Sequence, residues 1–323
     1  YKSPYLYLMF MEKVNDRLFQ RTHSNYRYLP AGAKRKSVFT DYLFLAPAIL
    51  YFAVFIYYPA FQAFYLSFFK YRISGNTFIG LKNYIDLFQD PHFYSESVIT
   101  TLQLGLWNVG LSFVIPLFLS LLLFELHRPA LQKTYQIIYY LPQLFSWAVV
   151  GGMFIIMFAP EGGIVNNFVK KFGGEPIKFM LSNRWIQPIL ILSSVWKTMG
   201  GTVIIYMAAL FSIDPQILEA SAIDGVPSIK KHFYIVIPLL KPIIVTLFVL
   251  NFTAQILMVD QGYNMVAPSV EEKGRTVMLF MLRNGYNNLR LGYAAAVSIV
   301  VFIVTFFLSI LNARLTGWGK VED

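Results

Sequence analysis

The sequence contains no cysteine and only four histidines in 323 residues. A chain without thiols forms neither a disulfide nor a thiolate metal site. No two of the histidines have the close spacing that places two imidazoles on one metal ion. They are His23, His92, His127 and His232. We therefore expect no bound metal and no catalytic group built on histidine or cysteine.

Charged residues are scarce as well. They make up 14% of the sequence, whereas an average soluble domain carries about 25%. Hydrophobic residues supply 56% of the chain, and several apolar runs exceed the roughly 20 residues that cross a bilayer as a helix. The composition indicates an integral membrane protein rather than a soluble enzyme.

Six apolar runs predict an all-α, polytopic fold with six transmembrane helices. At about 1.5 Å per residue, each run is long enough to cross the hydrocarbon core with some tilt. The predicted spans cover residues 42–69, 98–123, 135–158, 186–211, 233–258 and 291–313. We assign residues 38–323 to this transmembrane domain and residues 1–37 to a separate N-terminal segment.

The N-terminal segment is basic and amphipathic. Its apolar residues recur at helical spacing from Leu8 to Leu18, which predicts a short helix on the membrane surface or against a partner. The run Lys34-Arg35-Lys36 directly precedes the first span. Because basic residues accumulate on the cytoplasmic side, we predict that both termini are cytoplasmic. The formal net charge of +10 then indicates contact with anionic lipid rather than with nucleic acid.

The loop between the fourth and fifth spans is polar and carries few bulky side chains. Asp214 can cap a helix that begins at Pro215. The small residues 220–222 would let another protein approach the helix backbone closely. Gly225 allows a left-handed turn, and Pro227 can open a second helix. We predict two short helices at an angle to each other, protruding from the cytoplasmic face.

The same loop carries a recognisable motif. Residues 219–225 read Glu-Ala-x-x-x-Asp-Gly, and Ile-x-Ile-Pro-Leu-Leu-x-Pro follows at residues 235–242. Further matches extend over nearly the whole chain, including Tyr58-Pro59 and the run at residues 78–84. The sequence resembles the permease subunits of carbohydrate-type ABC importers, in the maltose and glycerol-phosphate branch, and residues 213–238 resemble their EAA coupling loop. One departure is Ser221, where many members carry alanine.

The resemblance implies that the loop docks on a cytoplasmic ATP-binding subunit and transmits its closure to the spans. It implies Glu219 as a charged contact to that subunit. The residues that would shape the docking element are Ala220, Ala222, Asp224 and Gly225.

The implied partners are a second homologous permease, two ATP-binding subunits, an extracytoplasmic solute-binding protein and the lipid of a bacterial cytoplasmic (inner) membrane. The chain itself is not expected to bind ATP. Gly75 and Gly80 have the spacing of a phosphate loop, but Leu81-Lys82-Asn83 follows Gly80 where Lys-Ser/Thr is required. ATP and Mg²⁺ are therefore expected on the partner ATPase, and we expect this chain to be a transport subunit rather than an enzyme.

Polar residues inside the spans predict a substrate path, because such groups are costly in hydrocarbon and tend to face a cavity or a partner. Ser194, Thr198 and Gly201 lie near positions that contact sugar in maltose-type permeases, by the same resemblance. The full set of candidates is Ser194, Trp196, Lys197, Thr198, Gly201, Asn251, Thr253 and Gln255. A single serine or threonine in such a set could equally well bond a neighbouring helix.

Lys197 leaves two interpretations open. An ammonium group in a hydrated path could attract an acidic oligosaccharide such as alginate, or a phosphate ester. It could instead belong to an ion pair within the membrane or extend to the interface.

The alternative within the same family to an importer of oligosaccharides is a glycerol-phosphate or neutral-sugar permease. Two function hypotheses of other classes also compete with it. A proton-coupled secondary transporter would favour inverted repeats and carboxylates inside the spans, and these spans offer almost none. An intramembrane enzyme would need a nucleophile and base or metal ligands within the spans.

Overall fold

The computed structural model describes residues 31–72, 75–126 and 128–315, with side chains from Tyr42 onward except those of Asn312 and Leu315. The predicted amphipathic helix before residue 31 lies outside the described residues. The chain divides into two compact units, residues 1–61 and 62–323. The division that we predict between residues 37 and 38 falls within a helix of the first unit, so it stays a prediction.

The described part of the first unit is one long helix. It consists of α2 (Ala31–Phe52), the π-helical turn η1 (Ala53–Tyr57) and the first residues of α3 (Tyr58–Leu66). Its side chains from Tyr42 to Phe61 are exposed, and Phe44 is 82% exposed. So much unburied apolar surface requires lipid or another subunit around it.

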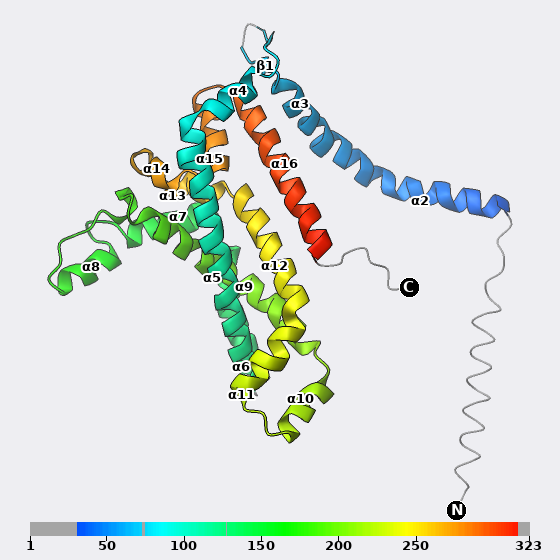
Figure 1. The fold of residues 1–323 in the computed structure, drawn as a ribbon, viewed down its shortest axis with the longest axis vertical. Helices are drawn as coiled ribbons and strands as arrows, with labels where there is room; N and C mark the ends of the chain where they lie inside the picture. The colour runs from blue at the N-terminus through cyan, green and yellow to red at the C-terminus, as the bar shows by residue number, and fades with distance from the viewer. Residues whose placement is uncertain (1–30, 73–74, 127, 316–323) are drawn as a thin grey trace, which may run out of the picture. The chain divides into compact units, whose positions relative to one another are not determined.

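The second unit is almost entirely helical (Figure 1). A short hairpin of β1 (Phe69–Lys70) and β2 (Thr77–Phe78) pairs Phe69 with Phe78. The longest helices are α5 (Ile99–Phe124), α9 (Ile186–Phe211), α12 (Ile237–Leu257) and α16 (Leu291–Leu315). The shorter helices are α4 (Lys82–Gln89), α6 (Pro129–Tyr140), α7 (Trp147–Met157), α8 (Ile164–Lys171), α10 (Pro215–Ile223), α11 (Ser228–Lys231), α13 (Asp260–Met265), α14 (Glu271–Gly274) and α15 (Val277–Leu282).

Single turns of other helix types join these elements. They are the π-helical η2 (Phe93–Val98), η5 (His232–Val236) and η7 (Arg283–Asn287), and the 3₁₀ turns η3 (Leu141–Leu144), η4 (Phe179–Leu181) and η6 (Pro268–Val270). Helix α9 contributes the most buried face, since Ile186, Val203, Tyr206 and Leu210 are completely covered. It packs chiefly against α5, and these two helices form the centre of the second unit.

Five of the predicted spans appear as single apolar helices long enough to cross a membrane. They are Tyr42–Leu66, Phe93–Phe124, Ile186–Phe211, Ser228–Leu257 and Leu291–Leu311. The third predicted span, over 135–158, is present as a bent pair of helices, Pro129–Leu144 and Trp147–Met157, so the described part of the chain has up to six candidate spans if this pair counts as one. That segment is broken between Leu144 and Trp147, where the two helical parts meet at an angle of 96°.

The break in the third span has local and distant causes. Pro142 removes one backbone donor in η3, which weakens a continuing helix. The Ser146 hydroxyl accepts a hydrogen bond of 3.3 Å from Val149 N and so caps the start of α7. The Lys197 Nζ on α9 donates to the carbonyl oxygens of Gln143 and Phe145, at 3.0 and 2.6 Å. Backbone groups that the bend leaves unpaired are thereby satisfied inside the protein.

Close contact between backbones holds the broken helix against α9. A Cβ atom on Gly200 would lie 2.1 Å from the Tyr139 carbonyl oxygen, which is far shorter than van der Waals contact. Only glycine therefore lets α9 approach the end of α6 this closely. The Lys197 ammonium also lies 5.5 Å from the Trp147 ring centroid, where the aromatic face favours a cation.

A cluster of charged residues joins the start of α5 to the segment after α13. Arg275 pairs with Glu96 and with Glu271, and Arg283 pairs with Glu271 and donates to the Val266 carbonyl oxygen. These four side chains are only 15–20% exposed. Local sequence patterns do not predict this cluster, because Glu96 and Arg275 are far apart in the chain.

We predict that Gly200→Ala destabilises the fold by roughly 1–3 kcal/mol, because the added methyl group must displace the Tyr139 backbone. The measurement is thermal unfolding of the detergent-solubilised protein. Gly110→Ala is the matched control, since Gly110 also lies within a helix but has open space at its Cβ position. Equal unfolding temperatures for the two variants would contradict the packing described here.

Candidate functional site

Helix α10 forms as the sequence predicts. Asp214 is its N-cap, and the carboxylate accepts a hydrogen bond of 2.9 Å from Gln216 N. Pro215 occupies the first helical position, where its missing N–H costs nothing. The helix ends at Gly225, whose φ of +67° is the left-handed conformation that glycine adopts without strain. The predicted cap and turn are confirmed.

Helix α10 contacts the core of the second unit through Leu218, which packs on the cluster containing Val236 and Leu240, and its opposite face is exposed. Ser221 is 4% exposed, and its hydroxyl donates to the Leu218 carbonyl oxygen at 2.7 Å. A hollow of about 380 Å³ separates α10 from the end of α9 and the start of α12. The predicted contact residues are all exposed: Glu219, Ala220, Ala222, Asp224 and Gly225.

Exposed apolar side chains accompany these residues. Ile223 at the end of α10 is 86% exposed, and Ile229 on α11 is 72% exposed. Isolated apolar residues on a surface are ordinary, but here they adjoin small residues and the exposed Glu219. We name the segment from Pro215 to Lys231, which comprises α10, the Gly225 turn and α11, the coupling element.

An ion pair links the end of the coupling element to the second span. Lys231 Nζ lies 2.8 Å from the Glu125 carboxylate, at the end of α5, and His232 Nε2 lies 3.0 Å from the same oxygen atom. The ion pair connects α11 to the end of α5, and the chain itself connects α11 to α12 through η5. Glu125 is not among the residues predicted from the sequence.

The coupling element and the β1–α4 region lie at opposite ends of the second unit (Figure 1). Helix α5 connects the two ends. It follows η2 beside α4 and finishes at Glu125 beside Lys231.

The predicted path residues separate into groups. Ser194 and Gln255 come together, because Gln255 Nε2 donates to the Ser194 hydroxyl at 3.3 Å. Asn108 on α5 completes this contact by donating to Gln255 Oε1 at 3.2 Å. Three helices, α5, α9 and α12, thus meet through polar side chains. Asn108 was not among the predicted residues, although a carboxamide inside a predicted span is the same signal that indicated Gln255.

The group around Asn108 retains unused hydrogen-bonding capacity. Its Oδ1 atom is buried and has no hydrogen-bond partner among the described residues, and the same is true of the hydroxyl of Ser112, one turn further along α5. Buried acceptors without partners are costly, so water or a ligand is expected near them.

The other predicted path residues lie elsewhere. Trp196 packs against Phe154 at a centroid distance of 6.0 Å and lines an apolar hollow of about 520 Å³. Lys197 belongs to the break in the third span, with two carbonyl oxygens as partners, and it makes no ion pair within the described residues. Gly201 faces the Gln143 side chain.

Three further candidates remain, and two of them make hydrogen bonds within their own helices. Thr198 Oγ1 donates to the Ser194 carbonyl oxygen at 2.8 Å, and Thr253 Oγ1 donates to the Val249 carbonyl oxygen at 3.0 Å. Asn251 is half-buried. These contacts within single helices leave the assignment of the three residues to a path as a prediction.

Comparison with known proteins assigns the chain to a family. Residues 112–317 match the model of the binding-protein-dependent transport system inner membrane component. The polygalacturonan/rhamnogalacturonan transport system permease protein YteP of Bacillus subtilis is 30% identical over 85% of this chain and 86% of its own length. The arabinooligosaccharides transport system permease protein AraP of the same organism is 29% identical, over 87% of this chain and 90% of its own length.

Solved structures give the same result. A chain from the crystal structure of a bacterial ABC transporter involved in the import of the acidic polysaccharide alginate superposes with a TM-score of 0.79 and 27% identity, covering 88% of this chain and 98% of that chain. The all-α, multi-span architecture and the resemblance found in the sequence are thus confirmed. The chain belongs to the family of binding-protein-dependent transport system inner membrane components, and it is an ABC importer permease, a transport subunit rather than an enzyme.

Proposed function

We propose that this chain is one permease half of an importer that carries an acidic oligosaccharide across the bacterial cytoplasmic membrane by alternating access. The observation that carries the proposal is the exposed coupling element at one end of a permease that is similar, over most of its length, to relatives handling oligosaccharides and polysaccharides. The acidic character rests on two relatives, named for polygalacturonan and for alginate.

The coupling element receives force from ATP-binding subunits in this proposal. ATP binding closes a pair of such subunits, which carry ATP and Mg²⁺. Glu219 and the small residues after it seat in one of them. The movement passes through Lys231 and Glu125 to α5, and through η5 to α12. The coupling element and both termini are then cytoplasmic, and a solute-binding protein docks at the opposite end.

The substrate path in this proposal includes the polar contact of Asn108, Gln255 and Ser194. These groups join three spans, and the unpartnered oxygens of Asn108 and Ser112 offer acceptors for sugar hydroxyls. Thr198, Asn251 and Thr253 stay candidates for the proposed path, which a second, homologous permease would complete. The exposed apolar surface of the first unit would contact that permease or lipid.

We predict that Gly225→Asp abolishes transport while membrane insertion persists, because the left-handed turn that sets the angle between α10 and α11 becomes strained. Gly173→Asp is the matched control, since Gly173 also has a left-handed φ, +80°, and an open Cβ position but lies outside the coupling element. ATP hydrolysis and uptake are measured together in proteoliposomes. Equal uptake in both variants would refute the role of this turn.

We expect Glu219→Ala to reduce the coupling of ATP hydrolysis to transport by about tenfold, because a charged contact worth about 1.5 kcal/mol is lost. Glu175→Ala, which removes an exposed carboxylate outside the coupling element, should leave the coupling ratio unchanged. A normal ratio in Glu219→Ala would remove this residue from the interface.

The two interpretations of Lys197 give different results. Lys197→Gln removes the charge but keeps an amide donor for the carbonyl oxygens of the helix break, whereas Lys197→Met removes both. We predict that Met lowers stability by roughly 1–3 kcal/mol and that Gln recovers much of this loss, because the buried carbonyls keep a partner. Uptake of an acidic oligomer is measured beside stability. Loss of that uptake in a stable Gln variant, with neutral-oligomer uptake intact, would instead assign Lys197 to charge recognition.

Competition for uptake distinguishes the substrates. We expect an unlabelled uronate oligomer to reduce uptake of a labelled one, with neutral arabino-oligomers and glycerol phosphate as much weaker competitors.

The energy source is tested separately. Depletion of ATP should stop the uptake, and an uncoupler at constant ATP should not. The reverse pattern would establish proton coupling.

A further inference from the structure

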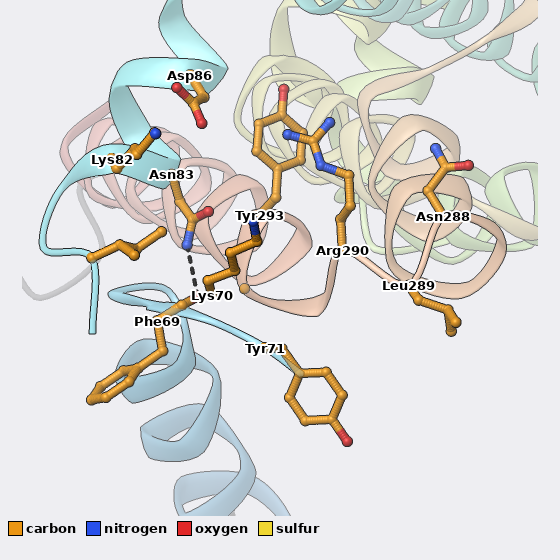
Figure 2. Close-up of a pocket in the computed structure, with 12 residues that line it drawn as sticks. Phe69, Lys70, Tyr71, Lys82, Asn83, Asp86, Asn288, Leu289, Arg290 and Tyr293 are labelled. Carbon is orange, nitrogen blue, oxygen red and sulfur yellow. Dashed lines mark hydrogen bonds between the residues drawn. The ribbon is translucent and has the colours of Figure 1, made fainter. Parts of the chain in front are cut away.

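A pocket of about 400 Å³ lies between β1, α4 and the start of α16 (Figure 2). It is at the end of the second unit opposite the coupling element, where α3 ends and α16 begins. This inference rests on the orientation in the proposed function, in which the pocket opens on the extracytoplasmic side, at the end where the solute-binding protein docks. The proposed transport steps assign the pocket itself no role.

The pocket is predominantly cationic. Lys70, Lys82 and Arg290 line it, and Asp86 is its one carboxylate. Figure 2 shows these side chains arranged around Tyr293. Within the described part of the chain, none of the three cations makes an ion pair or a side-chain hydrogen bond, although Asp86 stands one turn from Lys82 on α4. Their donors are free to bind a ligand.

Tyr293 and Asp90 hold the Arg290 side chain in position at the pocket. Its guanidinium lies 4.1 Å from the Tyr293 ring centroid, and the Tyr293 hydroxyl donates to the Asp90 carboxylate at 2.9 Å. A guanidinium stacked in this way keeps the N–H groups at its edge available for an oxyanion. Leu289, directly before Arg290, has a φ of +53° and is the one non-glycine residue with positive φ among those described. Such strained backbone often marks a binding site.

The opposite wall is equally well fixed. Asn83 Nδ2 donates to the carbonyl oxygens of Ser67 and Phe69, at 2.8 and 3.1 Å. Gly292 allows α16 to approach β1, because a Cβ atom there would lie 2.0 Å from the Phe69 carbonyl oxygen. The cations thus surround a hollow whose walls are held by hydrogen bonds and backbone contact.

We propose that this pocket binds a single oxyanion group, either the phosphodiester of an anionic lipid or the carboxylate of a sugar acid. Three unpaired cations around one hollow would repel one another without such a ligand. The volume accommodates a headgroup or one sugar ring. Exposed Tyr71 and Leu289 at its edge add apolar contact for either.

The test uses the full chain, purified from membranes with its associated subunits but without the solute-binding protein. Retention of phosphatidylglycerol is measured by native mass spectrometry, and trigalacturonate binding by titration calorimetry at low salt. Diacylglycerol, which lacks the phosphodiester, is the control ligand. The variants are Lys82→Ala/Arg290→Ala and, with Arg290 and its stacking intact, Lys70→Glu/Lys82→Glu. Lys170→Ala/Lys171→Ala is the control for loss of charge.

Both pocket variants should weaken binding of at least one anion by about tenfold or more, because charge-assisted hydrogen bonds are lost. A loss confined to phosphatidylglycerol identifies the ligand as lipid, and a loss confined to trigalacturonate identifies a sugar acid. Unchanged binding of both anions, or an equal loss in the Lys170/Lys171 control, would overturn the proposal. ATP-coupled transport by the Gly225→Asp variant is a separate measurement. It shows whether the proposed role of the coupling element is wrong, independently of whether the pocket binds an anion.

Discussion

The hydrocarbon core accepts no unpaired backbone groups, and this constraint governs the structure of the chain. Continuous helices satisfy it over the five unbroken spans. In the third span the two helical parts meet at 96°, and side chains pair the backbone groups that the bend exposes. Ser146 caps the start of α7, and Lys197 of α9 donates to the carbonyl oxygens of Gln143 and Phe145. An ammonium group in the membrane is thus explained by the backbone around it. Gly200 supplies the close approach that makes this possible.

Local hydrogen bonds and turns pair backbone groups at the ends of α10 in a similar way, and they shape the coupling element. Asp214 satisfies an N–H group at the start of α10, and Gly225 ends the helix with a left-handed turn. Its outer face is exposed. The ion pair from Lys231 to Glu125 gives it a second attachment to the spans, besides the chain itself.

The sequence predicted those features that depend on neighbouring residues. The spans, the capped helix at Pro215 and the turn at Gly225 follow from local composition, propensity and spacing. The family also followed from the sequence, because the coupling loop carries a motif of fixed spacing. Contacts between distant segments could not be predicted in this way. Lys197 was noticed as costly in a span, but its partners, Gln143 and Phe145, lie more than fifty positions away in the sequence.

The candidate path shows the same division. Ser194 and Gln255 were selected as polar residues within spans, and the fold brings them together with Asn108. Trp196 and Lys197 were selected by the same argument, and the fold directs them to an apolar hollow and to the helix break. Packing decides which side of a helix faces a cavity. The faces of each span are too similar in hydrophobicity for the sequence to show which side that is.

The absence of native cysteine makes one measurement especially direct. A single cysteine at Ala222, on the open face of the coupling element, can carry a photoactivatable crosslinker in the intact, transporting assembly. We predict a covalent adduct between this chain and an ATP-binding subunit, and none from a cysteine placed at Asn167 on α8. An assembly that transports substrate and yet gives no such adduct at Ala222 would contradict the account that force enters the membrane through this element.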